Sequence, residues 1–264
     1  MSQYKKPYNH KIVMYNIKNL NSCNLFFANS IAKFYLIVFL VVSSNLLAPN
    51  AIYAQINRMK VMQTEDVTIY YPKYKSLDLS CGDMPNSSDS SIIFCAEAAY
   101  TGELLTTFSH LNIAGNHVSS GVFYKGYACE DNTGAFIYYN NKWKFIFGDN
   151  QSEMLNAEKY KGMAFGQSMI IHNGDTKPLT RSATSENYYR ALSELNGKLC
   201  IIDSRNIIPY SKFVKDLELL GVTNAIYLDM GEGWNYSWYR DSSDVLHFIH
   251  SIRIPFTTNW IVFR

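Results

Sequence analysis

Two aspartates, Asp203 and Asp229, stand at the ends of two short apolar runs in the C-terminal half of the sequence. The runs, residues 199–203 and 224–229, have the length and composition of buried strands. Helix start and stop signals lie between them, over residues 209–221. A strand, a crossover helix and a parallel strand form a right-handed unit, so both strands end at the same edge of the sheet. We therefore expect the two carboxylates at one edge, where open sheets of this kind bind ligands.

A pair of carboxyl groups suits hydrolysis of a glycosidic or phosphate ester bond, because one group must carry a proton and the other must not. The alternative is that one aspartate caps the turn after its strand. Arg190 precedes a strand expected to pair with residues 199–203, and a guanidinium beside two acids suits a phosphodiester. Its alternative is an ion pair with Asp203 or Glu194. Arg181 and Arg240 are weaker candidates for the same role.

The loop after Asp229 adds further groups to this edge. Glu232 is either a third acid of the site or a solvated loop charge. Gly231 and Gly233 would let the backbone approach a ligand or offer amides to an anion. Trp234 would stack on a sugar, with packing in the core as the alternative. The two glycines do not predict a dinucleotide site, because the third glycine is missing and a strand-like segment follows.

Asn116 and His117 lie in a polar loop between two glycines, residues 115–121, a typical setting for function. His117 is a candidate proton donor because imidazole titrates near neutral pH, although a lone histidine is more often structural. His247 and His250 are three residues apart in a strand-like run, so they point to opposite faces and do not predict a shared metal. No metal or other cofactor is predicted.

The N-terminal segment has the composition of a secretory signal. No acidic residue precedes Glu65, five lysines are present, and an apolar run at residues 34–42 is followed by small residues up to Ala54. This pattern predicts a cleaved signal over residues 1–54, a domain over residues 55–264, and a periplasmic or secreted protein without a stable membrane span. An uncleaved anchor is the alternative. Without the five lysines, basic residues no longer outnumber the 22 acids, which disfavours nucleic-acid binding.

The remaining pattern predicts one α+β domain: a mixed, mainly antiparallel sheet with flanking helices and one βαβ crossover. Asn140-Asn141 and Asn196-Gly197 mark two hairpins. The apolar run 92–100 does not distinguish strand from helix. Cys81 and Cys95 flank a polar, turn-rich segment and are the best candidates for a disulfide.

The glycine-bracketed loop 115–121, the strand-like runs that contain Arg190 and Asp203, and the Leu228-Asp229 pair before Gly231 occur together within residues 112–263. In this combination the sequence resembles the phosphodiester glycosidase family. In the wider family a Leu-Asp pair is followed by three glycines and a serine. Leu228, Asp229 and Gly231 match that pattern, whereas Met230 and Glu232 stand where glycines are usual. The resemblance is closest to a bacterial subgroup that shares a GWNYSWYRD pattern. The other matching segments are Gly115–Gly121, Phe165-Gly166-Gln167, Tyr189-Arg190-Ala191-Leu192 and Cys200-Ile201-Ile202-Asp203-Ser204.

The resemblance implies hydrolysis of a sugar-1-phosphodiester, similar to a GlcNAc-1-phosphodiester, to free sugar and a phosphomonoester. Asp229 would act as acid/base or nucleophile with Asp203 or Glu232 as its partner, and Arg190 would hold the phosphate. A non-catalytic glycan-binding protein that retains the fold is the alternative. The expected substrate-binding residues are Arg190, Asn116, His117, Gln167, Gly231, Gly233, Trp234 and Asn235.

Overall fold

The computed structural model describes residues 58–101, 111–126, 133–148, 150–231, 236–252 and 257–264. These residues belong to one compact unit, Ala54–Arg264. The predicted signal segment, residues 1–54, lies outside them. Among the described residues, neither helix has the length and apolar character needed to cross a membrane.

The largest sheet has eleven strands, and all of its described pairings are antiparallel. Its main path runs β1-β2-β13-β12-β15-β9-β5-β6, while β7 and β10 also pair with β9, and β8 pairs with β7. The strands are β1 (Met59–Gln63), β2 (Val67–Pro72), β5 (His117–Ser119), β6 (Val122–Tyr124), β7 (Thr133–Tyr139), β8 (Lys142–Phe147), β9 (Met163–His172), β10 (Asp175–Thr176), β12 (Arg190–Leu195), β13 (Lys198–Ser204) and β15 (Asn224–Leu228).

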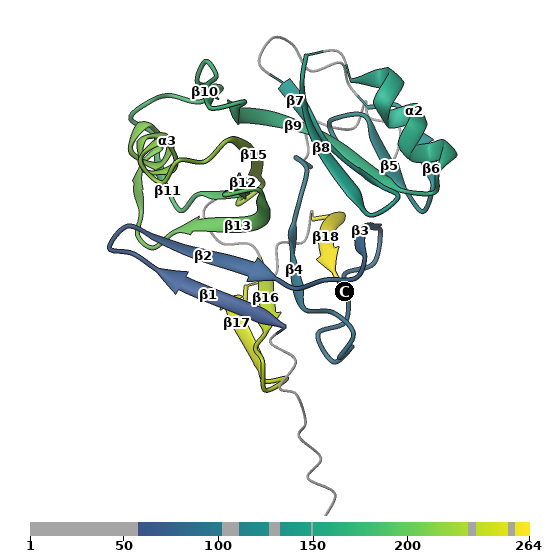
Figure 1. Cartoon of the computed structure of the whole chain (residues 1–264), viewed down its shortest axis with the longest axis horizontal. Coiled ribbons are helices and arrows are strands. Elements are labelled where there is room, and N and C mark those ends of the chain that lie inside the picture. Colours follow the sequence, from purple (N-terminus) through teal and green to yellow (C-terminus); the bar gives the residue numbers. More distant parts are fainter. Residues whose placement is uncertain (1–57, 102–110, 127–132, 149, 232–235, 253–256) are drawn as a thin grey trace, which may run out of the picture. The chain divides into compact units, whose positions relative to one another are not determined.

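A second sheet has five strands in the order β17-β16-β4-β18-β3, and β11 pairs with β14 in a small separate ladder. Figure 1 shows the strands of the five-stranded sheet together with α3, which lies beside β12, β13 and β15. The elements are β3 (Leu77–Cys81), β4 (Phe94–Glu97), β11 (Glu186–Asn187), β14 (Ile208–Pro209), β16 (Ser237–Arg240), β17 (Leu246–His250), β18 (Asn259–Phe263), α2 (Gln151–Lys159) and α3 (Tyr210–Leu219).

The predicted α+β class is wrong, because the protein is β-rich and the described residues contain only two helices. The predicted mixed sheet is wrong too, since each described pairing is antiparallel. β13 and β15 do run in the same direction, but β12 lies between them and is antiparallel to both. The apolar runs gave no sign that β12 would lie between β13 and β15, because any strand covered on both faces has the same composition.

Both faces of these three strands are covered. Leu192, Ile201 and Ile226 pack in a cluster with residues of the five-stranded sheet. Alternate residues on the other face, such as Ala191 and Ile202, pack against the apolar side of α3. Successive side chains of a strand point to opposite faces, so alternate residues of each strand belong to different cores. Packing on both faces holds the ends of the strands in place.

Local turn chemistry was predicted correctly. β12 and β13 form the expected hairpin, and its Asn196 and Gly197 have φ of 53° and 67°, the left-handed values of a type I′ turn. The predicted disulfide is wrong, because Cys81 and Cys95 are both free thiols. β18 separates their strands, β3 and β4, and Cys81 stands opposite Asn259 whereas Cys95 stands opposite Val262, three residues further along. The two residues therefore lie roughly 14 Å apart, beyond the reach of a disulfide.

Candidate functional site

Arg190 and the two predicted aspartates lie at the same end of the central strands. In the sheet register Arg190 stands opposite Asp203 on β13 and opposite Leu228 on β15, the residue before Asp229. The backbones of all three therefore meet at one edge. Their side chains do not converge, however, and they belong to two separate polar groups.

The first group is a buried ion pair. Arg190 Nε donates to Asp203 Oδ1 at 2.7 Å, and Nη2 donates to Oδ2 at 2.6 Å. The Arg190 side chain has no exposed surface and that of Asp203 is 7% exposed. Nη1 of Arg190 has no hydrogen-bond partner among the described residues. This is the ion pair considered as the alternative for Arg190, and the geometry gives no support to a contact with phosphate.

The second group pairs Asp229 with Glu97, a residue that the sequence pattern did not indicate. Glu97, the last residue of β4, shares a hydrogen bond with Asp229, and the two residues are 2% and 7% exposed. Thr257 Oγ1 donates to Glu97 Oε2 at 2.7 Å, and Thr101 Oγ1 donates to Oε1 at 3.3 Å. The pair joins the end of a strand in the second sheet to the end of β15 in the first.

Backbone contacts fix both carboxyl groups. The Asp229 amide donates to the carbonyl oxygen of Ala98, and the Gly231 amide donates to Asp229 Oδ1 at 2.9 Å. The latter bond is the turn-capping role considered as the alternative for Asp229. Behind them, the fully buried Asn259 accepts from the Ala99 amide at 2.8 Å and donates to the Ala99 carbonyl at 2.9 Å. Asn259 thus clamps the chain immediately after Glu97.

Burial sets the proton state of this pair. Desolvation and the nearby Asp229 charge raise the pKa of Glu97 to about 9. Desolvation also raises the pKa of Asp229, while the Gly231 amide and the Arg181 charge act against that shift. Two carboxyl groups in hydrogen-bond contact hold one proton near neutral pH, since a second negative charge would be unfavourable there. We assign the proton to Glu97, because burial and the Asp229 charge both raise its pKa, whereas the Gly231 amide and the Arg181 charge favour the carboxylate form of Asp229.

Arg181 supplies the positive charge beside Asp229. Its guanidinium lies over the ring of Tyr227, with the carbon 4.2 Å from the ring centroid, and Nη2 donates to the Tyr100 hydroxyl at 2.7 Å. Tyr227 is fully buried, whereas Arg181 and Tyr100 are half-buried. Arg181 Nε has no hydrogen-bond partner among the described residues. The cation–π contact therefore holds the guanidinium of Arg181 against the ring of Tyr227, and its Nε is a donor without a partner in the described part of the chain.

Three other predicted residues lie on or near β5 and β9. Asn116 Oδ1 accepts from the Gly126 amide at 2.9 Å. His117 is fully buried, with Nδ1 3.1 Å from the Gly115 carbonyl oxygen and its ring stacked on Tyr124. Gln167 Oε1 accepts from the next backbone amide at 2.8 Å, and the buried Nε2 has no partner among the described residues.

The glycines around Asn116 have a packing role. A Cβ on Gly115 would come within 2.7 Å of the Gly166 carbonyl oxygen, and one on Gly126 would come within 2.3 Å of Gly115. Three stretches of backbone therefore cross in contact, which only glycine permits.

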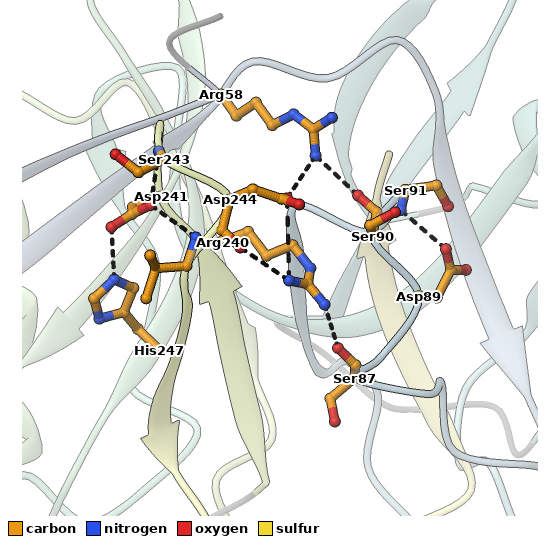
Figure 2. A network of polar contacts seen from close by, with 11 residues as sticks. Arg58, Ser87, Asp89, Ser90, Ser91, Arg240, Asp241, Ser243, Asp244 and His247 are labelled. Carbon is orange, nitrogen blue, oxygen red and sulfur yellow. Dashed lines mark hydrogen bonds and ion pairs between the residues drawn. The ribbon is translucent and has the colours of Figure 1, made fainter. Parts of the chain in front are cut away.

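Glu232, Gly233, Trp234 and Asn235 lie outside the described residues. Arg240, the other weaker candidate, belongs to a different region (Figure 2). Its guanidinium donates to the carbonyl oxygens of Asp244 and Ser87 and helps to hold the turn after β16.

Sequence reasoning missed Glu97, Asn259 and both threonines. A signal for Glu97 was present, because it is the single charge in the apolar run 92–100, and charged residues are rarely buried without a partner. Asn259 and Thr257 are brought in by β18, which is more than 150 residues from Glu97 in the chain, and no local pattern indicates that pairing. Among the described residues, no group of three or more His, Cys, Asp or Glu is arranged to hold a metal ion.

Comparison with known proteins gives a fold relationship. The chain is similar to the catalytic domain of zebrafish N-acetylglucosamine-1-phosphodiester alpha-N-acetylglucosaminidase, solved in a form auto-inhibited by its pro-peptide. The TM-score is 0.53 at 12% identity, over 78% of this chain and 80% of that one. A hypothetical protein from Synechocystis gives a TM-score of 0.47 at 13% identity, over 78% of this chain and 61% of that one. No family model and no curated protein matches the sequence.

At 12% identity the likeness shows a shared fold and no more. The family resemblance of the sequence motifs is therefore supported only as a distant fold relationship.

Proposed function

We propose that this protein is a hydrolase that cleaves the bond between a sugar and a phosphate in a sugar-1-phosphodiester. The observation that carries the proposal is the Glu97–Asp229 pair, two buried carboxyl groups in hydrogen-bond contact with an arginine beside them. The shared fold with a phosphodiester glycosidase domain is consistent with this assignment.

The closeness of the two carboxyl groups argues for a particular leaving group. Ordinary glycosidases separate their two carboxyl groups by about 5 Å or more, so that one can protonate the leaving alcohol across the bond. Glu97 and Asp229 share a hydrogen bond and cannot be arranged in that way. A phosphomonoester leaving group has a second pKa of about 6, far below that of an alcohol, so it departs without a proton from a dedicated acid.

Arg181 supports the same conclusion. A phosphodiester carries a negative charge, and a guanidinium has five N–H donors, of which Arg181 gives one to the Tyr100 hydroxyl, so donors remain for phosphate oxygens. Contact with the Tyr227 ring fixes the plane of the fork, so little side-chain entropy is lost on binding. Arg181 takes the phosphate-binding role that the sequence analysis gave to Arg190, whose guanidinium is occupied by Asp203.

The reaction follows from these roles. A water oxygen attacks the anomeric carbon, and the carboxylate of Asp229 takes the proton of that water. The bond between the anomeric carbon and the phosphate oxygen breaks, and its electron pair leaves with the phosphate. Arg181 offsets the charge that develops on the departing oxygen. Glu97 keeps its own proton and hydrogen-bonds to Asp229, which positions the base and prevents a second negative charge from forming beside the anionic substrate.

The test is turnover by the purified full chain of a GlcNAc-1-phosphodiester, with release of GlcNAc and phosphomonoester measured separately. Asp229→Asn removes the base without changing its size and should lower kcat about 10²–10⁴-fold. Asp175→Asn, an exposed acid on β10, is the matched control and should retain parent activity. An Asp229→Asn variant with the parent rate would contradict the proposal.

A non-catalytic glycan-binding protein is the second candidate, and the burial of both carboxyl groups favours it. Saturable sugar binding by the parent chain without turnover of any phosphodiester would support it.

The leader-like composition of residues 1–54 supports a periplasmic or secreted location, which immunoblotting of cell fractions with an antibody to the C-terminal domain tests.

A further inference from the structure

A cavity of about 760 Å³ opens at the far end of the central strands from Asp229. The turn between β12 and β13, from Leu195 to Lys198, forms part of its wall. Arg190 and Asp203 lie at the opposite ends of the same two strands, five residues away, which corresponds to roughly 17 Å. The cavity is therefore separate from the candidate active site, and its volume is that of a small-ligand site.

Three lysines give this cavity its charge. They are Lys60 on the edge strand β1, Lys73 just after β2 and Lys198 at the start of β13, and all three are exposed. No Asp or Glu stands among the lining residues, and within the described part of the chain none of the three forms an ion pair.

Other lysines of the same chain behave differently. Lys144 pairs with Glu153, Lys215 pairs with Glu218, and Lys212 contacts two aspartates. The three lysines that line the cavity have no such acidic partner among the described residues, which favours an anionic ligand.

Aromatic rings line the same space. Tyr71, Tyr74 and Trp143 are half-buried residues of its wall. Edge-on contacts hold two of them, since Trp143 packs on Phe145 with centroids 5.8 Å apart and Tyr74 packs on Phe263 at 5.1 Å. Fixed amphipathic rings provide flat apolar surfaces for a sugar ring together with polar groups at the edge. Simple anions such as inorganic phosphate make no use of such surfaces.

We propose that this cavity binds an anionic saccharide, with Lys60, Lys73 and Lys198 contacting its acidic groups and Tyr71, Tyr74 and Trp143 contacting its rings. The proposal does not depend on the proposed hydrolase function. It requires only that the ligand combine sugar rings with phosphate, sulfate or carboxylate groups.

Isothermal titration calorimetry on the full chain tests this with three probes. The probes are a sulfated dextran tetrasaccharide, the same tetrasaccharide without sulfate, and tripolyphosphate. We expect the sulfated tetrasaccharide to bind roughly tenfold or more tightly than either of the others, a difference of about 1.4 kcal/mol or more. Equal binding of tripolyphosphate would mean that charge alone is recognised and would overturn the proposal, as would equal binding of the neutral sugar or no binding of any probe.

Variants locate the binding. The triple variant Lys60→Gln/Lys73→Gln/Lys198→Gln alters only exposed side chains and should weaken binding of the sulfated tetrasaccharide roughly tenfold or more. Trp143→Phe keeps a ring for packing on Phe145 and should weaken binding less than the triple variant does. Lys142→Gln removes a charge from the residue beside Trp143 that does not line the cavity, and it should bind as the parent does. Unchanged binding in the triple variant, or equal loss in Lys142→Gln, would overturn the proposal.

Discussion

The guanidinium of Arg190 and the carboxylate of Asp203 face each other across β12 and β13, joined by two parallel hydrogen bonds of 2.7 and 2.6 Å. The pair lies in the core beside Tyr70, whose pKa is raised by burial first and by the Asp203 charge second. A planar guanidinium forms two parallel hydrogen bonds with a carboxylate in only one alignment, so this contact favours one register of the β12–β13 hairpin. The end of β15 that precedes Asp229 lies beside the same end of this hairpin. Its first role is therefore structural.

Breaking this ion pair should destabilise the fold. Asp203→Asn leaves a buried guanidinium without its counter-charge, and we expect the free energy of unfolding to fall by about 3–5 kcal/mol. Chemical denaturation followed by far-UV circular dichroism measures the change. The double variant Arg190→Met/Asp203→Leu removes both charges and should recover most of the loss. A stability loss in the double variant equal to the sum of the losses in Arg190→Met and Asp203→Leu would contradict this account.

The raised pKa of Glu97 predicts how stability depends on pH. Between the ordinary glutamate pKa and about 9, the folded protein keeps a proton that the unfolded chain releases. The contribution of Glu97 is therefore complete below the ordinary pKa and is lost as pH rises through about 9. Glu97→Gln keeps a donor to Asp229 but cannot titrate, so its stability should fall less with pH than that of the parent, by roughly 2–4 kcal/mol over this window. Parallel stability–pH curves for parent and variant would refute the assignment of the proton.

The same proton state predicts the pH dependence of activity. The active form has Asp229 ionised and Glu97 protonated, so kcat should fall on the acid side as Asp229 gains a proton, at a pH above its usual pKa. It should fall on the alkaline side as Glu97 loses its proton, near pH 9. Glu97→Gln should abolish the alkaline fall. Steady-state kinetics on a GlcNAc-1-phosphodiester across pH measures both limbs, and an alkaline limb that persists in Glu97→Gln would exclude Glu97 as its source.

Asn259 should act as a positioning residue for Glu97. Its amide makes both hydrogen bonds to Ala99, two residues beyond Glu97, and Asn259→Ala would leave two buried backbone groups unpaired. We expect a stability loss of about 2–4 kcal/mol together with a lower kcat and a shifted alkaline limb in the pH profile. Asn156→Ala on α2 is the control. A purely structural role would lower stability and leave the pH profile unchanged.

Local features of this fold were predictable from sequence, and non-local ones were not. The Asn196-Gly197 turn and the apolar run of β13 depend on neighbouring residues, so their pattern identifies them. The insertion of β12 between β13 and β15 depends instead on a hairpin that folds back into the sheet. The parallel relation of β13 and β15 was inferred correctly, but the class of the sheet was not.

The candidate site shows the same division. Asp229 was found because it ends a strand and precedes a glycine-containing loop. Its partner Glu97 comes from the other sheet, and Thr257 and Asn259 reach it through the pairing of β18 with β4. The sequence pattern favoured Arg190 over Arg181 because Arg190 adjoins a strand. Arg190 is the first residue of β12, and its side chain is buried in the core. The fold relationship alone does not indicate which arginine is used.

Arg181 is the last test of the proposed reaction. Arg181→Lys keeps the charge but loses the planar fork and most of the contact with Tyr227, so KM for a phosphodiester should rise and kcat should fall, together about 10–10³-fold in kcat/KM. Product inhibition by a phosphomonoester should weaken in parallel, because the same fork would hold the product. Arg205→Gln, an exposed arginine after β13, is the control and should match the parent. If Arg181→Lys retained parent kinetics and parent inhibition, while Arg190→Lys lost phosphate inhibition and remained folded, the phosphate would belong to Arg190 and the assignment of Arg181 would fall.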